Sequence, residues 1–151
     1  MTSKTTRGDS ARTPGHLIRR LHQLSTRVFT ERVRDAGFDL TPVQFIALDT
    51  LRENAGIDQA GLALAIAKDR ATLGAVADRL AQKGLVTRVV SPRDKRAREL
   101  ELTEKGRITI EAMLPVVLNL QKDILPGLSA DEYRQFIDLA FKAAKAADDS
   151  A

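Results

Sequence analysis

Residues 69–102, DRATLGAVADRLAQKGLVTRVVSPRDKRARELEL, decide the fold. The stretch opens with Asp69, a good helix N-cap because its carboxylate accepts hydrogen bonds from the free N–H groups of a first helical turn. Four apolar residues then follow the i, i+3, i+4, i+7 spacing of one buried helix face: Leu73, Val76, Ala77 and Leu80. Lys83-Gly84 supplies a cation and a residue that tolerates positive φ, which is typical of a helix end. The sequence therefore predicts a capped helix that stops at Gly84.

Two short strands joined by a basic turn follow this helix. Residues 86–90 alternate in side as a half-buried strand does, and so do the acidic and apolar residues at 99–102. Between the alternating runs lie four cations and one acid: Arg93, Asp94, Lys95, Arg96 and Arg98. A helix beside a β-ribbon with a basic tip suits DNA, because the helix fits the major groove and the tip reaches phosphates or the adjacent minor groove.

These residues also carry a family resemblance. Residues 69–88 are followed by Pro92-Arg93-Asp94-Lys95-Arg96 and then by Leu102-Thr103-Glu104-Lys105-Gly106. In order and spacing, above all Asp94-x-Arg96 followed by Leu-Thr-x-x-Gly, these motifs resemble the MarR family of bacterial transcription regulators. The resemblance implies a winged helix-turn-helix homodimer on a palindromic operator, often released from DNA by a small aromatic or phenolic ligand.

Composition sets limits on the class of protein. With 151 residues, of which 43% are hydrophobic and 29% charged, the chain is long enough for one domain with a real core. A net charge of +4 permits an anionic partner without requiring one. The absence of cysteine excludes disulfides, thiolate metal sites and the thiol-oxidation sensing of one branch of the MarR family. No apolar run reaches the ~18 residues that span a membrane, and the first residues lack a signal peptide's apolar core, so we expect a cytoplasmic protein.

The fold class expected is mainly α with a small β-wing (α+β), with about six helices in one compact domain. Residues 1–13 lack periodicity and are expected to be a disordered tail. Residues 14–38 should hold an N-terminal dimerisation helix, from about His16 to Asp35, and residues 39–103 the winged helix-turn-helix lobe. Residues 104–147 should form C-terminal dimerisation helices.

Capping residues mark the predicted helix starts: Thr41 before Pro42, Asp58, Asp69, Thr103, and Ser129 in a capping box with Glu132. The helix after Asp58 is expected to end at Ala67. The helix after Thr103 is expected to reach Leu125 with an interruption at Pro115, because proline removes a backbone hydrogen bond. This last helix is apolar on more than one face, so it needs cover from two sides, and a second subunit supplies the second.

The outward face of the helix after Asp69 is the candidate DNA-reading face, since recognition helices contact bases with their N-terminal residues. Arg70 suits a guanine edge, while Thr72 and the nearby alanines suit thymine methyl groups. The predicted DNA-binding set is Lys68, Arg70, Ala71, Thr72, Ala75, Arg79, Arg93, Asp94, Lys95, Arg96 and Arg98. Lys68 and Arg79 suit phosphates. For the basic turn, the alternative is a solvated hairpin tip; by resemblance, Arg96 enters the minor groove and Asp94 orients it through a salt bridge.

No residue set suggests an enzyme, a metal or a cofactor. His16 and His22 are the only histidines, and neither has the partners of a metal site or a catalytic triad. His22, at the edge of an apolar stripe, is a candidate to hydrogen-bond a phenol or carboxylate; the alternative is an ordinary interface or core histidine. Adding the pocket position that the resemblance implies, the candidate ligand-binding residues are Arg19, His22, Ser25, Phe45, Leu48 and Met113.

The sequence therefore predicts a ligand-responsive, homodimeric repressor that binds a pseudo-palindromic double-stranded operator. Two alternatives use the same fold. One is an architectural DNA binder without a ligand, which operator affinity unchanged by aromatic acids would favour. The other is a winged-helix protein-interaction module, which salt-insensitive binding without a DNA complex would favour.

Overall fold

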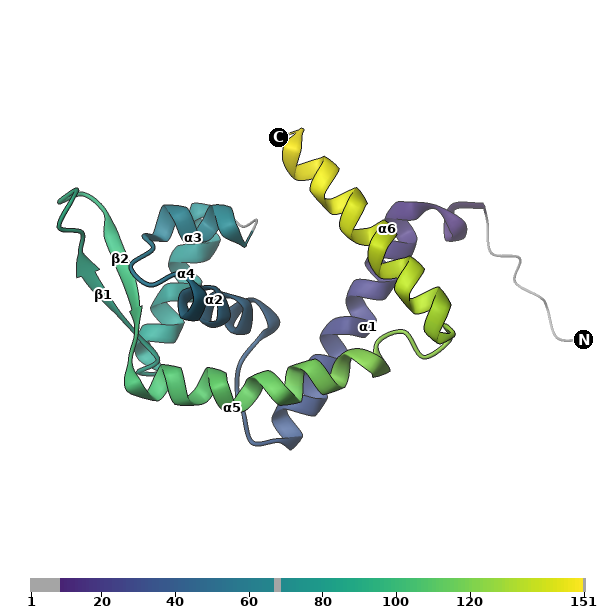
Figure 1. The fold of residues 1–151 in the computed structure, drawn as a ribbon, viewed down its shortest axis with the longest axis horizontal. Helices are drawn as coiled ribbons and strands as arrows, with labels where there is room; N and C mark the ends of the chain where they lie inside the picture. Colours follow the sequence, from purple (N-terminus) through teal and green to yellow (C-terminus); the bar gives the residue numbers. More distant parts are fainter. Residues whose placement is uncertain (1–8, 67–68, 151) are drawn as a thin grey trace, which may run out of the picture.

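The computed structural model describes residues 9–66 and 69–150. Within these ranges the chain forms six α-helices, two 3-10 helices and one two-stranded antiparallel sheet (Figure 1). In chain order these are η1 (Asp9–Arg12), α1 (Pro14–Asp35), α2 (Pro42–Glu53), α3 (Gln59–Ala65), α4 (Arg70–Gln82), β1 (Val86–Val90), β2 (Arg98–Leu102), α5 (Glu104–Leu120), η2 (Gln121–Asp123) and α6 (Ala130–Asp149). This is the mainly α fold with a small β-wing that the sequence predicts.

Helix α5 connects the two ends of the molecule. In Figure 1, α2, α3, α4 and the β-ribbon gather at one end, and α1 crosses α6 at the other. Helix α5 runs between them and contacts α1, α2 and β2. One helix therefore packs against both the helix-turn-helix lobe and the N-terminal helix.

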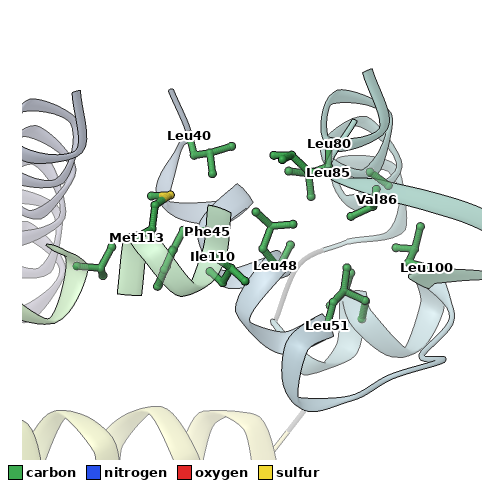
Figure 2. Packing of buried hydrophobic residues seen from close by; sticks show 14 of the residues in the cluster. Leu40, Phe45, Leu48, Leu51, Leu80, Leu85, Val86, Leu100, Ile110 and Met113 are labelled. Atoms are coloured by element: carbon green, nitrogen blue, oxygen red, sulfur yellow. The ribbon is translucent and has the colours of Figure 1, made fainter. Parts of the chain in front are cut away.

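The hydrophobic core lies where α2, α4, α5 and the start of the ribbon meet (Figure 2). Leu73, Ala77 and Leu80 of α4 are buried, as the helical spacing predicts. The core also holds the fully buried side chains of Leu48, Leu62, Leu100, Ile110, Met113 and Leu120. Their burial fixes α4 and the ribbon on a common base.

The predicted N-caps are confirmed. The Asp69 Oδ1 atom accepts a 2.8 Å hydrogen bond from the Thr72 backbone N–H, which starts α4. Thr41 and Ser129 form capping boxes at α2 and α6, and Asp58 and Thr103 accept from the third residue of α3 and α5. Gly84, with φ of +73°, takes the left-handed conformation expected after α4.

Several boundaries differ from the prediction. Helix α1 begins at Pro14, because a proline at the first helical position has its φ already set, and η1 occupies residues 9–12 of the expected tail. Helix α3 ends at Ala65, and the predicted end at Ala67 lies outside the described residues. Helix α5 continues through Pro115, so the predicted interruption there is wrong: the proline removes one backbone hydrogen bond without ending the helix. The helix ends at Leu120 instead of Leu125, since the chain tightens into η2, where the Ile124 N–H donates to the Gln121 carbonyl.

The ribbon pairs Val86 with Leu102 and Val90 with Arg98. Val86 and Leu100 are buried, whereas Glu101 and Thr87 are exposed, so one face of the ribbon packs on the core. Beyond it, the Ser91 hydroxyl accepts hydrogen bonds from the backbone N–H groups of Arg93 and Asp94 and shapes the turn.

The Leu-Thr-x-x-Gly motif joins α5 to the end of α4. The Thr103 hydroxyl donates to the Gly84 carbonyl at 2.6 Å, and its N–H donates to the Leu85 carbonyl at 3.0 Å. Lys105 Nζ donates to the Lys83 carbonyl at 3.0 Å. A Cβ atom on Gly106 would lie 2.0 Å from the Leu85 carbonyl oxygen, so only glycine allows this approach. The motif therefore has a structural reason within this chain.

Candidate nucleic-acid interface

The first turn of α4 presents an exposed face. Arg70, Ala71, Thr72 and Ala75 are all exposed, as the helical wheel predicts. The Thr72 hydroxyl donates to Asp69 Oδ2 at 2.7 Å, so the hydroxyl is engaged in capping the helix. Together with the backbone N–H of Thr72, this bond holds the pKa of Asp69 below its usual range. The methyl group of Thr72 is left for an apolar contact.

Two further predicted phosphate contacts belong to this helix region. Arg79 is exposed in the last part of α4. Lys68 lies outside the described residues. Of these two residues, only Arg79 lies within the described ranges, about two and a half turns after Arg70 on α4.

The turn between β1 and β2 carries exposed cations. Arg93, Lys95, Arg96 and Arg98 are exposed, and within residues 9–66 and 69–150 none of the four has an ion-pair partner. Their charge is therefore available to an anionic partner.

The expected salt bridge between Asp94 and Arg96 is wrong for this structure. Asp94 Oδ1 accepts a 3.0 Å hydrogen bond from the backbone N–H of Arg96 instead of pairing with its guanidinium. This is the local turn that aspartate favours, because its short side chain reaches the backbone two residues on. Asp94 shapes the turn and leaves the Arg96 side chain unpaired.

A shallow cavity of about 220 Å3 brings the two basic segments together. Arg70, from the first turn of α4, lines it with Arg96 and Arg98 from the wing. Asp58 and Gln59, around the start of α3, line the same cavity. Three arginines thus line one cavity where the first turn of α4 meets the β-ribbon, which suits a phosphate backbone passing between two grooves.

The candidate ligand residues separate into two groups. His22 and Ser25 line a largely apolar groove of about 400 Å3 between α1, η2 and α6, together with Tyr133 and Phe136. Arg19 is exposed on α1 and lines neither this groove nor the shallower one of about 540 Å3 on the other side of His22.

The expected pocket walls Phe45, Leu48 and Met113 are core residues instead. They are 6%, 0% and 0% exposed and belong to the hydrophobic cluster (Figure 2). The Phe45 ring packs against Phe29 with centroids 6.1 Å apart. The packing of α1 on α2 and α5 fills the space in which the sequence placed a pocket. These three residues line none of the grooves described above.

Two other features are absent from the part of the chain that the structure describes. No helix there is both long enough and apolar enough to cross a membrane. No three His, Asp or Glu side chains within the same ranges gather closely enough to hold a metal ion.

Comparison with known proteins decides the family. A family model described as "MarR family" matches residues 38–97, the segment from the end of α1 to the wing. The HTH-type transcriptional repressor NicR of Pseudomonas putida is 35% identical over 118 residues, which cover 78% of this chain and 73% of NicR. The chain belongs to the MarR family. Members of this family are DNA-binding transcription regulators and not enzymes, so this MarR protein is a transcriptional regulator.

Solved MarR-family structures share the whole fold. BpsR of Bordetella bronchiseptica, studied for the regulation of its DNA binding by 6-hydroxynicotinic acid, has 28% identity and a TM-score of 0.82, over 91% of this chain and 97% of BpsR. PcaV of Streptomyces coelicolor, solved with its natural ligand, has 32% identity and a TM-score of 0.83, over 93% and 98%. The winged helix-turn-helix fold is therefore confirmed for this MarR protein.

The contacts of one arginine beside this interface are not predicted by the sequence. Arg88 of β1 hydrogen-bonds to α3 and α4, whereas the sequence predicts only that it belongs to a half-buried strand. The signal that could have found it is Asp78, a lone acid on the outward side of α4.

Proposed function

We propose that this MarR protein is a homodimeric repressor that binds a pseudo-palindromic operator and is released by a small aromatic acid. Residues 39–103 would form the DNA-binding lobe and the flanking helices the dimer. The observation that supports the DNA face is that Arg70, Arg96 and Arg98 line one cavity, while the wing cations have no ion-pair partner among residues 9–66 and 69–150.

On this proposal the N-terminal turn of α4 enters the major groove. Arg70, Ala71, Thr72 and Ala75 would meet base edges, and Arg79 and Lys68 would contact phosphates. The wing residues Arg93, Lys95, Arg96 and Arg98 would reach the neighbouring backbone and minor groove, with Asp94 holding the turn. A dimer would place two such helices ~34 Å apart, one turn of DNA.

The proposal of a second subunit is supported by exposed apolar side chains on α1, α5 and α6. Ile18, Leu118 and Leu139 are 65%, 64% and 66% exposed. Large apolar side chains gathered on one end of a protein mark an interaction surface. A second copy of the chain would cover them.

The effector proposal rests on relatives and on one groove. BpsR responds to 6-hydroxynicotinic acid, and PcaV was solved with a natural ligand. In this chain the groove beside His22 and Ser25 offers polar groups within apolar walls, which is the usual make-up of a small-molecule site. An aromatic acid there would weaken DNA binding if it bound the DNA-incompetent state more tightly, with a typical coupling of about 1–3 kcal/mol.

The test of the DNA face is a titration of wild type and Arg96→Ala on a fragment of the gene's own upstream region, at several salt concentrations. Wild type should bind tightly and lose affinity steeply with salt, and Arg96→Ala should bind more weakly with a salt slope smaller by about one. Arg134→Ala, which removes an arginine paired with Asp131 on α6, is the matched control and should bind as wild type does. Absence of any DNA binding by wild type would refute the proposal and favour the protein-interaction module.

The test of the effector uses the same titration with 6-hydroxynicotinic acid and a panel of phenolic acids. At least one acid should lower operator affinity about 5- to 150-fold, and His22→Ala should reduce that response while leaving ligand-free DNA binding intact. Operator affinity unchanged across the whole panel would favour the ligand-independent architectural binder.

A further inference from the structure

A single arginine of the wing connects β1 to both helices of the helix-turn-helix. Arg88 Nε donates to Gln59 Oε1, at the start of α3, at 2.8 Å. Its Nη2 donates to the Gly74 carbonyl of α4 at 3.3 Å and lies 2.5 Å from Asp78 Oδ1, one turn further along the same helix. One side chain thus has acceptors on two helices.

The geometry of a guanidinium makes these contacts restrictive. Its donors lie in one plane at fixed angles, so three acceptors on two helices are satisfied together only in one relative arrangement of those helices and β1. Arg88 itself is fixed by the ribbon, where it pairs with Leu100, a fully buried residue. The position of β1 is therefore transmitted to the middle of α4.

The same contacts leave Arg88 poorly placed to bind DNA. Its Nε and Nη2 donors are engaged by acceptors of this chain, and Asp78 balances its charge. Arg93, Lys95, Arg96 and Arg98 are exposed as Arg88 is, but among the residues that the structure describes they have no ion-pair partner. Arg88 thus differs from the arginines that would contact phosphates.

We propose that Arg88 is a positioning residue that sets the recognition helix against the wing, and so controls the preference for the operator over other DNA, without touching DNA. The inference rests on the proposed DNA face, because only a helix that reads bases gains from an accurate position. Asp78 and Gln59 share this role, because they contact the Arg88 guanidinium and hold it in position.

The experiment measures affinity for the operator and for random DNA of the same length, at several salt concentrations, for Arg88→Ala, Arg88→Lys and Asp78→Asn. Arg88→Ala should weaken operator binding about tenfold, the equivalent of one hydrogen bond to a charged group, and random DNA much less. The salt slope should stay at the wild-type value, since no phosphate contact is lost. Arg88→Lys should fail to restore operator preference, because a point charge cannot bridge separate acceptors.

Asp78→Asn is the decisive variant, because it weakens the ion pair between Arg88 and residue 78 while leaving Arg88 in place. It should lower operator preference at an unchanged salt slope, and it decides the matter if Arg88→Ala does not fold. Arg79→Ala, an exposed arginine on the same helix, is the matched control: it should weaken operator and random DNA alike and reduce the slope by about one.

Two outcomes would overturn the inference. One is a reduced salt slope in Arg88→Ala, matching Arg79→Ala, which would make Arg88 a phosphate contact. The other is wild-type operator preference in Arg88→Ala or Asp78→Asn. If wild type itself shows no preference for any operator, the proposed function fails instead, so the two failures are distinguishable.

Discussion

At the scale of single residues, Gly106 is a position with no room for a side chain. It stands in the first turn of α5, and a side chain there would meet the Leu85 carbonyl oxygen at 2.0 Å and the Leu85 carbonyl carbon at 3.0 Å. Both atoms belong to the backbone that leads from α4 into β1, so they cannot rotate away. Any larger residue must push α5 off the helix-turn-helix lobe.

Gly106→Ala should therefore lower the free energy of unfolding by about 1–3 kcal/mol or more, the usual cost of overpacking. For a chain of this size that is a fall in Tm of about 4–10 °C. Thermal unfolding followed by circular dichroism would measure it.

Gly74→Ala is the matched control for this prediction. A Cβ on Gly74, inside α4, would meet nothing within 4 Å, so alanine should stabilise the helix by about 1 kcal/mol. If both alanine variants melted at the wild-type temperature, the tight approach at Gly106 would be contradicted.

The residue scale also shows what sequence can and cannot reveal. Gly106 was recognised as part of a motif, but its reason is a contact with Leu85, a residue 21 positions earlier in the chain. Arg88 was missed because a strand pattern says which side a residue faces, not which acceptors lie there. Phe45 is expected in a pocket wall only from the family resemblance, and periodicity cannot correct this, because it distinguishes buried from exposed positions and not core from cavity. The ring neighbour of Phe45, Phe29, comes from another helix.

At the scale of elements, the starts of the helices were predictable and their ends less so. A cap is a local event: Asp69 and Thr72 are three residues apart, and so are Ser129 and Glu132. The end of α5 is marked less locally: after Leu120 the chain tightens into η2, where the Ile124 N–H donates to the Gln121 carbonyl and Asp123 forms a 2.8 Å ion pair with Arg32 of α1. A partner on α1 cannot be seen in the local sequence that predicts an end at Leu125.

The cap of α4 predicts a pH dependence of stability. The backbone N–H and hydroxyl of Thr72 hold the pKa of Asp69 below its usual range. A carboxyl group with a lowered folded-state pKa stabilises the protein above its unfolded-state pKa of ~4, and that contribution is lost as the pH falls through the lower folded value. Wild type should therefore exceed Asp69→Asn in Tm by a constant margin at neutral pH, and the margin should shrink below about pH 4.

Thermal melts of the two proteins between neutral pH and the acid limit of folding would measure this margin. Thr72→Val removes the hydroxyl donor and keeps the backbone donor, so the folded-state pKa of Asp69 should lie closer to its unfolded-state value. The stability that this variant loses on acidification should therefore be smaller than in wild type, and the loss should be complete at a higher pH. A margin that stayed constant through the acid range would show that the Asp69 carboxylate does not stabilise the cap.

At the scale of the whole molecule, α6 is the element least covered by the rest of the chain. None of its residues is buried, and Leu139 and Phe141 are 66% and 72% exposed. Its sequence nevertheless has an apolar side, which a monomer leaves in water. In the proposed dimer, a second copy of the chain would cover this apolar side.

Leu139→Glu should weaken the dimer about 10-fold to 100-fold, because burying a leucine side chain is worth about 1.5–3 kcal/mol and a buried carboxylate costs more. Analytical ultracentrifugation over a range of protein concentrations would measure the dissociation constant. Lys145→Glu introduces the same charged residue on the same helix at a position that is already polar, and should leave the constant near that of wild type. Equal effects of the two changes would place the interface elsewhere.

The continuity of α5 has a mechanical consequence. Its 17 residues form one rod about 25 Å long, anchored at the Thr103 end to the carbonyls that finish α4. A tilt of about 10° at the α1 end would displace the other end by about 4 Å, slightly more than the ~3.4 Å rise of one base pair. In a dimer, the two DNA-binding lobes must match half-sites at a fixed spacing. A displacement of that size in each subunit would move both lobes out of line with their half-sites. Because α5 is long, a small rearrangement among α1, η2 and α6 would thus displace the DNA-binding lobe by about the rise of one base pair.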